Sequence, residues 1–299
     1  MQHHADPMRY VSLGTYPIRQ PVQGGQLRAN AIHKVLRDCG WETRHVLVTP
    51  NRGARREMEA GDLFIEMPRR FRKQMARRKW RSDVATAEFV ARSRSHRLEI
   101  ARFLDDFRPD VIAVEQCWLW PALREYVETC SPEARFSIVY SSHNVEQQLL
   151  AQEAAIAGAG TDLWSARRAA DIESDLAANA DLVVAVSEQD AAYFRTLNPS
   201  VVVAANGVWP RETPVGLDRW ASRFAGLRTA LFVGSGQSAQ RPRFSPDDGS
   251  GPWFPLSLGA DCGGRRRCRS DPQRSRIPAA PWRGQCPGRV AWHAGRRDP

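Results

Sequence analysis

The sequence contains no run of about 20 consecutive apolar residues, the length that a membrane-spanning helix needs. Residues Met1–Met8 also lack the apolar core of a signal peptide. We therefore expect a cytoplasmic protein that does not cross a membrane. The six cysteines include no Cys-x-x-Cys pair, so the sequence predicts no metal site.

The stretch from residue 237 to residue 299 lacks six residue types altogether: Lys, Glu, Thr, Tyr, Met and Asn. The same stretch is rich in Arg, Pro and Gly, with 12, 9 and 8 of them. Its 12 arginines stand against 5 aspartates, so it carries most of the chain's net charge of +10. Residues 1–236 are close to neutral and do not by themselves suggest a polyanionic partner.

Two interpretations fit the composition of this tail. Shifted codons of a GC-rich gene encode mainly Arg, Pro, Gly, Ala, Ser, Cys and Trp, which is the mixture found here. A genuine disordered segment is the alternative. We favour the frameshift, and we expect residues 237–299 to form a disordered or aberrant tail.

Before the tail, short apolar runs alternate with stretches of helical periodicity, which is the pattern of a parallel α/β sheet. Strands are predicted near residues 10, 45, 112, 138, 184 and 202. The predicted helices are Leu27–Cys39, Asp83–Phe107, Trp120–Thr129 and Asp162–Ala178, whereas residues 51–82 give no clear pattern. This order implies a Rossmann-like, doubly wound sheet, in which ligands bind at the carboxyl ends of the strands.

Gly24 and Gly25 lie in the segment Pro17–Gln26, which we predict as a loop between the first strand and the first helix. Glycine lets the backbone approach a ligand closely, and a helix N-terminus offers free N–H groups to an anion. The pattern is not Gly-x-Gly-x-x-Gly, so a dinucleotide fingerprint is absent. An ordinary flexible loop is the alternative.

Polar residues also follow three of the later strands. His143 and Asn144 come after the strand near residue 138, with Glu146 close by. A histidine in this position can bind a hydroxyl or a phosphate, or it can simply cap the next helix. Ser187 follows the next strand and fits a capping box with Asp190.

Asn206 and Gly207 follow the strand near residue 202. Asn-Gly is a strong turn signal, so a plain turn is one interpretation of this pair. Its place at the end of the α/β pattern favours a binding role.

The segment Arg69–Arg81 contains eight basic residues and no acidic one, with Phe71, Met75 and Trp80 between them. Such a segment can dock on anionic lipid headgroups or on an anionic acceptor. We expect a peripheral contact with the inner face of the membrane. A solvated basic helix is the alternative.

Taken in order, these motifs resemble those of family 4-type glycosyltransferases. The resemblance is carried by Gly24-Gly25, Tyr140–Asn144, Ala180–Ser187, Asn206–Val208 and Leu231–Ser235. It covers residues 8–236. Enzymes of this family have two Rossmann-like domains, the GT-B fold, and use nucleotide sugars as donors without a metal in most cases.

The resemblance implies that residues 1–228 form the N-terminal, acceptor-side domain and that residues 229–236 are the first strand of a lost C-terminal domain. It places His143 near the reacting sugar as the catalytic residue. It gives donor or acceptor binding to Gly24, Gly25, Asn144, Glu146, Ser187, Asn206 and Gly207. No cofactor is implied beyond the nucleotide-sugar substrate.

The implied function is transfer of a sugar from a nucleotide sugar to a polysaccharide or glycolipid acceptor. The second domain of this family supplies a basic residue for the diphosphate and paired glutamates for the sugar and ribose. The tail of this chain contains no Lys and no Glu. We therefore expect little or no transferase activity from the chain as it stands.

Two other functions compete with this one. The arginine-rich tail, with Trp253, Trp282 and Trp292 for base stacking, suggests a nucleic-acid binder. Residues 1–236 contain no nucleic-acid recognition motif, so we do not expect such a partner. A nucleotide-binding enzyme of another class, such as a sugar epimerase, is disfavoured by the missing dinucleotide fingerprint.

Overall fold

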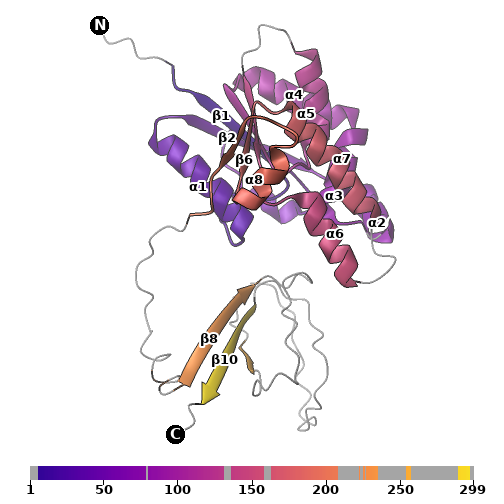
Figure 1. Ribbon diagram of the computed structural model, residues 1–299. Helices are drawn as coiled ribbons and strands as arrows, with labels where there is room; N and C mark the ends of the chain where they lie inside the picture. The colour runs from indigo at the N-terminus through magenta and orange to yellow at the C-terminus, as the bar shows by residue number, and fades with distance from the viewer. Residues whose placement is uncertain are drawn as a thin grey trace, which may run out of the picture. The chain divides into compact units, whose positions relative to one another are not determined.

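The computed structural model describes residues 6–78, 80–130, 136–157 and 163–207, together with residues 222 and 225 and the segments 227–234, 254–256 and 289–296. The chain divides into two units, Met1–Val208 and Trp209–Pro299. Figure 1 shows a helix-flanked sheet in the first unit and a few strands in the second.

The described strands of the first unit form one parallel sheet in the order β3-β2-β1-β4-β5-β6-β7. The order runs one way from β1 to β3 and the other way from β4 to β7, so it reverses between β1 and β4. The strands are β1 (Arg9–Gly14), β2 (Glu42–Thr49), β3 (Leu63–Glu66), β4 (Val111–Glu115), β5 (Ser137–Ser141), β6 (Leu182–Ala185) and β7 (Val201–Val203).

Two hydrogen bonds between Arg9 and Asp110, which we call the clasp, join the neighbouring strands β1 and β4 at their amino ends. The Arg9 N–H donates to a carboxylate oxygen of Asp110 at 2.7 Å, and the Asp110 N–H donates to the Arg9 carbonyl at 2.8 Å. These partners are 101 residues apart in the sequence. The clasp fixes the register in which Tyr10 of β1 faces Val111 of β4.

Helices connect the strands, as parallel pairing requires. Because crossovers are right-handed, the reversal of strand order puts helices on both faces, and the predicted Rossmann-like doubly wound sheet is confirmed. The helices are α1 (Gly24–Asp38), η1 (Arg52–Glu57, a 3₁₀ helix), α2 (Arg69–Arg78), α3 (Ser82–Arg92), α4 (Arg94–Phe107), α5 (Trp120–Thr129), α6 (Glu146–Ala157), α7 (Leu163–Asn179) and α8 (Glu188–Phe194).

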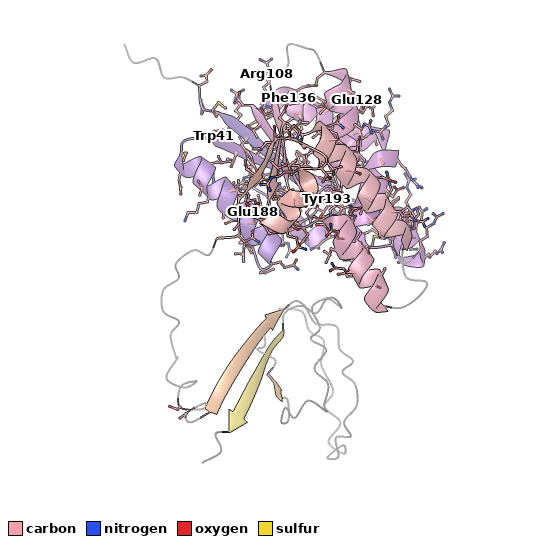
Figure 2. All side chains as sticks on the ribbon, viewed as in Figure 1. Trp41, Arg108, Glu128, Phe136, Glu188 and Tyr193 are labelled. Atoms are coloured by element: carbon pink, nitrogen blue, oxygen red, sulfur yellow. The ribbon has the colours of Figure 1, made fainter. Side chains whose placement is uncertain are left out.

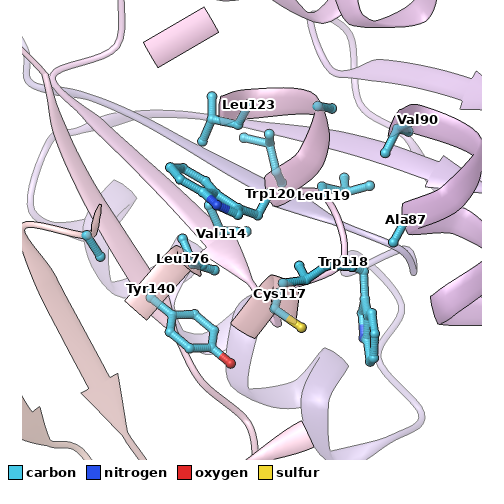
Figure 3. Packing of buried hydrophobic residues seen from close by; sticks show 14 of the residues in the cluster. Ala87, Val90, Val114, Cys117, Trp118, Leu119, Trp120, Leu123, Tyr140 and Leu176 are labelled. Carbon is cyan, nitrogen blue, oxygen red and sulfur yellow. The ribbon is translucent and has the colours of Figure 1, made fainter. Parts of the chain in front are cut away.

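The segment that follows β4 is anchored in the hydrophobic core. Four successive side chains from the loop after β4 to the first residue of α5 are almost fully buried: Cys117, Trp118, Leu119 and Trp120. Figure 3 shows them grouped with core residues that include Val114, Tyr140 and Leu176. This packing holds the carboxyl end of β4 in a fixed place.

The predicted single helix Asp83–Phe107 is wrong, because Ser93 divides it into α3 and α4. Ser93 has φ −103° and ψ 88°, which is outside the helical region. The side chain of Arg97 donates to the carbonyls of Val90 and Ala91 at 3.3 and 2.6 Å, so it satisfies the end of α3. Helical periodicity continues across the break, which is why the sequence does not reveal it.

Two other segments differ from expectation. Residues 51–82, which gave no clear pattern, contain η1, β3 and α2. Helix α1 begins at Gly24 rather than Leu27, so both glycines lie in its first turn and not in a loop. The Gln26 side chain accepts from the N–H groups of Val22 and Gln23 at 2.8 and 3.1 Å, which starts the helix early.

The second unit contains a three-stranded sheet in the order β8-β10-β9. Its strands are β8 (Leu227–Gly234), β9 (Phe254–Leu256) and β10 (Arg289–Arg296), and β10 pairs antiparallel with both others. The predicted strand at 229–236 overlaps β8. Apart from β9 and β10, the predicted disordered tail at 237–299 lies outside the described residues, and its frameshift origin stays a prediction.

Candidate functional site

The carboxyl ends of β1 and β4 lie side by side where the strand order reverses, and in doubly wound sheets this reversal opens a ligand-binding crevice. There β1 ends at Gly14 and β4 at Glu115. In Figure 2, Arg108 and Phe136 mark the amino edge of the sheet, whereas Glu188, which follows β6, marks the carboxyl edge.

His143, Glu115 and Tyr16 meet at this carboxyl edge and form what we call the His143 cluster. Nε2 of His143 lies 2.8 Å from Oε2 of Glu115. The phenol oxygen of Tyr16 lies 3.2 Å from Nδ1 of the same ring. The Glu115 side chain is fully buried and that of His143 is 7% exposed. The cluster thus joins the end of β4 to the loops that follow β1 and β5.

The hydrogen-bond partners assign the proton positions of the cluster. With Glu115 as a carboxylate, which can only accept, Nε2 of His143 is the donor. Nδ1 of the neutral ring then accepts from the Tyr16 hydroxyl. Burial, followed by the charge of Glu115, raises the pKa of Tyr16 well above its ordinary value, so the phenol keeps its proton. The carboxylate orients the imidazole, as in sites where histidine acts on a substrate.

Gly25 lies directly against the imidazole. A β-carbon at this position would be 2.7 Å from Nδ1 of His143 and 3.0 Å from the Tyr16 hydroxyl. At Gly24, by contrast, a β-carbon would meet nothing within 4 Å. The predicted close approach of the glycine backbone therefore occurs at Gly25, and the group that it approaches is the His143 ring. Contact of either glycine with a donor or acceptor stays a prediction.

Two buried glutamates lie at the start of α6, just after His143. The Glu173 carboxylate, from α7, accepts the N–H groups of Glu146 and Gln147 at 2.9 and 3.2 Å and the Tyr140 hydroxyl at 2.8 Å. Burial is the main cause that raises the pKa of the Glu173 carboxyl. Glu173 therefore caps α6 and fixes the loop that carries His143.

Glu146 is 4% exposed. Burial, then the charges of Glu173 and Asp83, raise its pKa to about 8, against hydrogen bonds from Asn144 and Gln116. Glu146 is therefore mainly protonated at neutral pH. The structure thus brings His143, Asn144, Glu146 and Gly25 into one region, and their catalytic or binding roles stay predictions.

Four buried polar atoms in this region have no hydrogen-bond partner among the described residues. They are Oε1 of Glu115, Oε1 of Gln116, Nε1 of Trp118 and Oγ of Ser141. Unpaired buried polar atoms are unusual because each costs free energy. The set contains both acceptors and donors.

A second polar chain lies behind the loop that carries Tyr16. Oγ of Ser12 is 2.7 Å from Nε2 of His33 and 2.8 Å from Nδ1 of His45, and Nε2 of His45 is 3.1 Å from the Tyr16 carbonyl. A carbonyl only accepts, so His45 donates through Nε2 and accepts from Ser12, which in turn accepts from His33. We call this chain the histidine relay.

Burial keeps the relay neutral. It is the main cause that lowers the pKa of His33 to about 2, and it also lowers the pKa of His45. Nδ1 of His33, an acceptor in this proton assignment, has no partner among the described residues. The relay joins β1, α1 and β2 to the backbone of Tyr16, and so holds one member of the His143 cluster.

Ser187, Asn206 and Gly207 form no hydrogen bond to the His143 cluster in the described part of the chain. The Ser187 hydroxyl accepts from the N–H of Asp190 at 3.1 Å, which confirms it as the N-cap of α8. Asn206 accepts from Arg28 of α1 at 3.1 Å, and a β-carbon at Gly207 would meet nothing within 4 Å. Their binding roles stay predictions.

Sequence reasoning missed Glu115 and Tyr16. Glu115 was placed at the end of a predicted buried strand, and a carboxylate in that position is a signal that was available. Tyr16 gave no signal, because its contact with His143 spans 127 residues. Ser12, His33 and His45 sit inside regular elements, where nothing in the sequence marks them.

Away from the cluster, a hollow of about 420 Å³ lies between α5 and α7. Its lining includes Trp120, Arg124, Arg168 and Asp175, and none of its lining residues belongs to the His143 cluster. Among the described residues, no group of three or more His, Cys, Asp or Glu side chains could hold a metal ion. No described helix is long and apolar enough to span a membrane.

Residues 23–207 match the model of the glycosyl transferase 4-like domain, which thus accounts for more than half of the chain. The chain belongs to this family. The matched range begins at the residue before α1 and ends four residues after β7, so it contains His143, Glu115 and Gly25 but not Tyr16. No curated protein sequence matches the chain.

Solved structures with a similar fold include sucrose-phosphate synthase from Thermosynechococcus elongatus (12% identity, TM-score 0.48, 67% of this chain and 48% of that one). A glycosyltransferase from Rickettsia africae ESF-5 is 13% identical (TM-score 0.37, 74% and 50%). The lipopolysaccharide outer core galactosyltransferase WaaB is 11% identical (TM-score 0.37, 67% and 46%). The chain thus spans about half the length of these proteins.

Proposed function

We propose that the first unit is the acceptor-side domain of a glycosyltransferase that moves a sugar from a nucleotide sugar to a polysaccharide or glycolipid acceptor. The observation that carries this proposal is the His143 cluster, which lies at the reversal point of a doubly wound sheet. Membership in the glycosyl transferase 4-like family supports it.

In this proposal His143 orients and polarises the reacting groups. Glu115 holds the ring from one side, and Tyr16 occupies Nδ1 until a substrate hydroxyl takes its place. Such pre-set hydrogen-bonding groups favour catalysis because they need little reorganisation when the substrate binds.

We further propose that the chain as it stands is inactive. Transfer between two substrates needs both held together in a closed cleft. The tail offers no Lys and no Glu for a donor site of the family's kind. A frameshift within the codons for Leu231–Arg243 accounts for this loss, and resequencing that region tests the idea directly.

The activity test uses a panel of radiolabelled nucleotide sugars with mixed lipid and polysaccharide acceptors. We expect no turnover from the full chain and measurable turnover from a chain whose reading frame is restored. In the restored chain, His143→Ala should lower kcat at least tenfold, whereas His96→Ala on α4 should not. Turnover by the present chain would contradict the proposed inactivity, and an inert restored chain would contradict the proposed function.

The predicted membrane contact of Arg69–Arg81 and the cytoplasmic location also stay proposals. Phe71 and Met75 pack against the core, so these two side chains are not free to enter a bilayer. Any lipid contact would therefore rest mainly on the charges of α2. Flotation with vesicles of phosphatidylglycerol tests it.

A further inference from the structure

Helix α2 presents a strongly basic surface with few internal partners. Arg69, Arg70, Lys73 and Arg77 are exposed, and in the described part of the chain no acidic group forms an ion pair with them. Only Arg72 of this helix is paired, with Glu66 at 3.6 Å. Unpaired cations on one helix attract an anionic partner.

Two stacked indole rings lie beside this helix. The rings of Trp80 and Trp164 are 5.1 Å apart and nearly parallel, at 15°. Trp164, the second residue of α7, is 41% exposed although one face of its ring is covered. Tryptophan is enriched at interfaces because its ring is apolar and its N–H is polar.

Arginines surround the stack. The guanidinium groups of Arg78 and Arg92 lie 5.0 and 5.9 Å from the ring centre of Trp80. Arg92 also pairs with Glu88 at 2.7 Å, and Glu88 pairs with Arg168 at the same distance. This packing holds Trp80 and leaves Trp164 as the outer ring of the stack.

The stack lies close in sequence to the carboxyl edge of the sheet. Trp80 stands two residues before α3, and Asp83 in the first turn of α3 accepts from the Thr15 hydroxyl at 3.1 Å. Thr15 directly follows β1 and precedes Tyr16. In Figure 1, α2, α3 and α7 lie on one side of the first unit.

We propose that the Trp80–Trp164 stack and the free cations of α2 form a docking surface for an anionic glycan, a chain of pyranose rings that carry carboxylates. The proposal rests on the proposed function and names its acceptor class. The C–H face of a pyranose ring packs on the face of an indole, and arginine pairs with carboxylates in a two-pronged geometry.

A lipid surface fits the same residues less well. Membrane-bound helices insert an apolar face, but the apolar residues of α2 face the protein core. The surface is therefore assigned to a glycan.

The test measures binding of the full chain to a defined oligogalacturonate by calorimetry. A neutral maltooligosaccharide of the same length and phosphatidylglycerol vesicles serve as comparison ligands. We expect only the oligogalacturonate to bind well, and Trp164→Ala to weaken it about tenfold. Trp41→Ala and Arg102→Gln, on other parts of the surface, are matched controls that should bind as the wild type does.

Because Trp164→Ala also uncovers Trp80, a double variant in α2 provides an independent test of the docking surface. Lys73→Glu with Arg77→Glu changes only exposed side chains of α2 and should also weaken binding at least tenfold. Equal binding of the neutral oligosaccharide, or unchanged binding by both variants, would overturn the proposal. So would vesicle binding without oligogalacturonate binding.

The binding assay does not depend on sugar transfer. The docking surface and the proposed transferase function can therefore be contradicted separately. Transfer by the restored chain to a neutral acceptor, with no affinity for oligogalacturonate, contradicts the docking surface alone. Specific oligogalacturonate binding that depends on Trp164, in a restored chain that transfers no sugar, supports the surface and contradicts the proposed function.

Discussion

The two adjacent glycines at the start of α1 differ in what surrounds them. We expect Gly25→Ala to displace the His143 ring and to cost about 1–3 kcal/mol of stability, because the new methyl group would lie 2.7 Å from Nδ1. Gly24→Ala meets open space and should be neutral or stabilising by up to about 1 kcal/mol. Urea unfolding followed by circular dichroism compares them, and equal effects would contradict the packing described.

The second prediction concerns how the stability of the fold changes with pH through Glu146. Its pKa rises from 4.5 to about 8 in the folded protein, so the fold favours the protonated form. Its stabilising effect is fully present below pH 4.5 and is lost as the pH rises through 8.

Glu146→Gln removes this titration. The unfolding free energy of the variant minus that of the wild type should therefore increase from pH 5 to pH 8, by at most about 1.4 kcal/mol per pH unit. Chemical denaturation at several pH values measures the difference, and a difference independent of pH would show that Glu146 is ionised in the fold.

At the scale of elements, the histidine relay joins β1, α1 and β2 through Ser12. Ser12→Ala leaves Nε2 of His33 and Nδ1 of His45 without partners and should cost about 1–3 kcal/mol. Ser137→Ala, at the exposed start of β5, is the matched control and should cost little. The midpoints of urea unfolding measure both changes.

The same elements show how far sequence reasoning reaches. Strands β1, β2, β4, β5, β6 and β7 were predicted because each is a short apolar run bounded by turn residues. β3 was missed because Leu63–Glu66 lies within residues 51–82, where the sequence showed no clear pattern. The break at Ser93 was missed because it depends on Arg97, whose side chain bonds are invisible in a linear pattern.

For the candidate site, sequence reasoning could find only side chains that directly follow a strand. His143, Asn144 and Glu146 were found in this way. The contacts that define the cluster join residues 28 and 127 positions apart, from Glu115 to His143 and from Tyr16 to His143. Such contacts follow from the strand order, which the sequence does not state.

For the whole molecule, the division between Val208 and Trp209 predicts that the first unit folds without the second. A chain that ends at residue 207 should unfold cooperatively at the same urea concentration as the full chain. A chain that ends at Ala180 loses β6, α8 and β7 and should not fold. Loss of cooperative unfolding in the longer variant would show that the second unit supports the first.

The clasp between Arg9 and Asp110 also has a consequence in time. The chain is synthesised from its N-terminus at about 5–20 residues per second, so β1 emerges several seconds before β4 exists. Throughout that interval Tyr10, Val11 and Leu13 have no β4 beside them, although all three are buried in the finished sheet. The centre of this sheet is therefore the part that a nascent chain must protect longest, and its closure over 101 residues is expected to be slow.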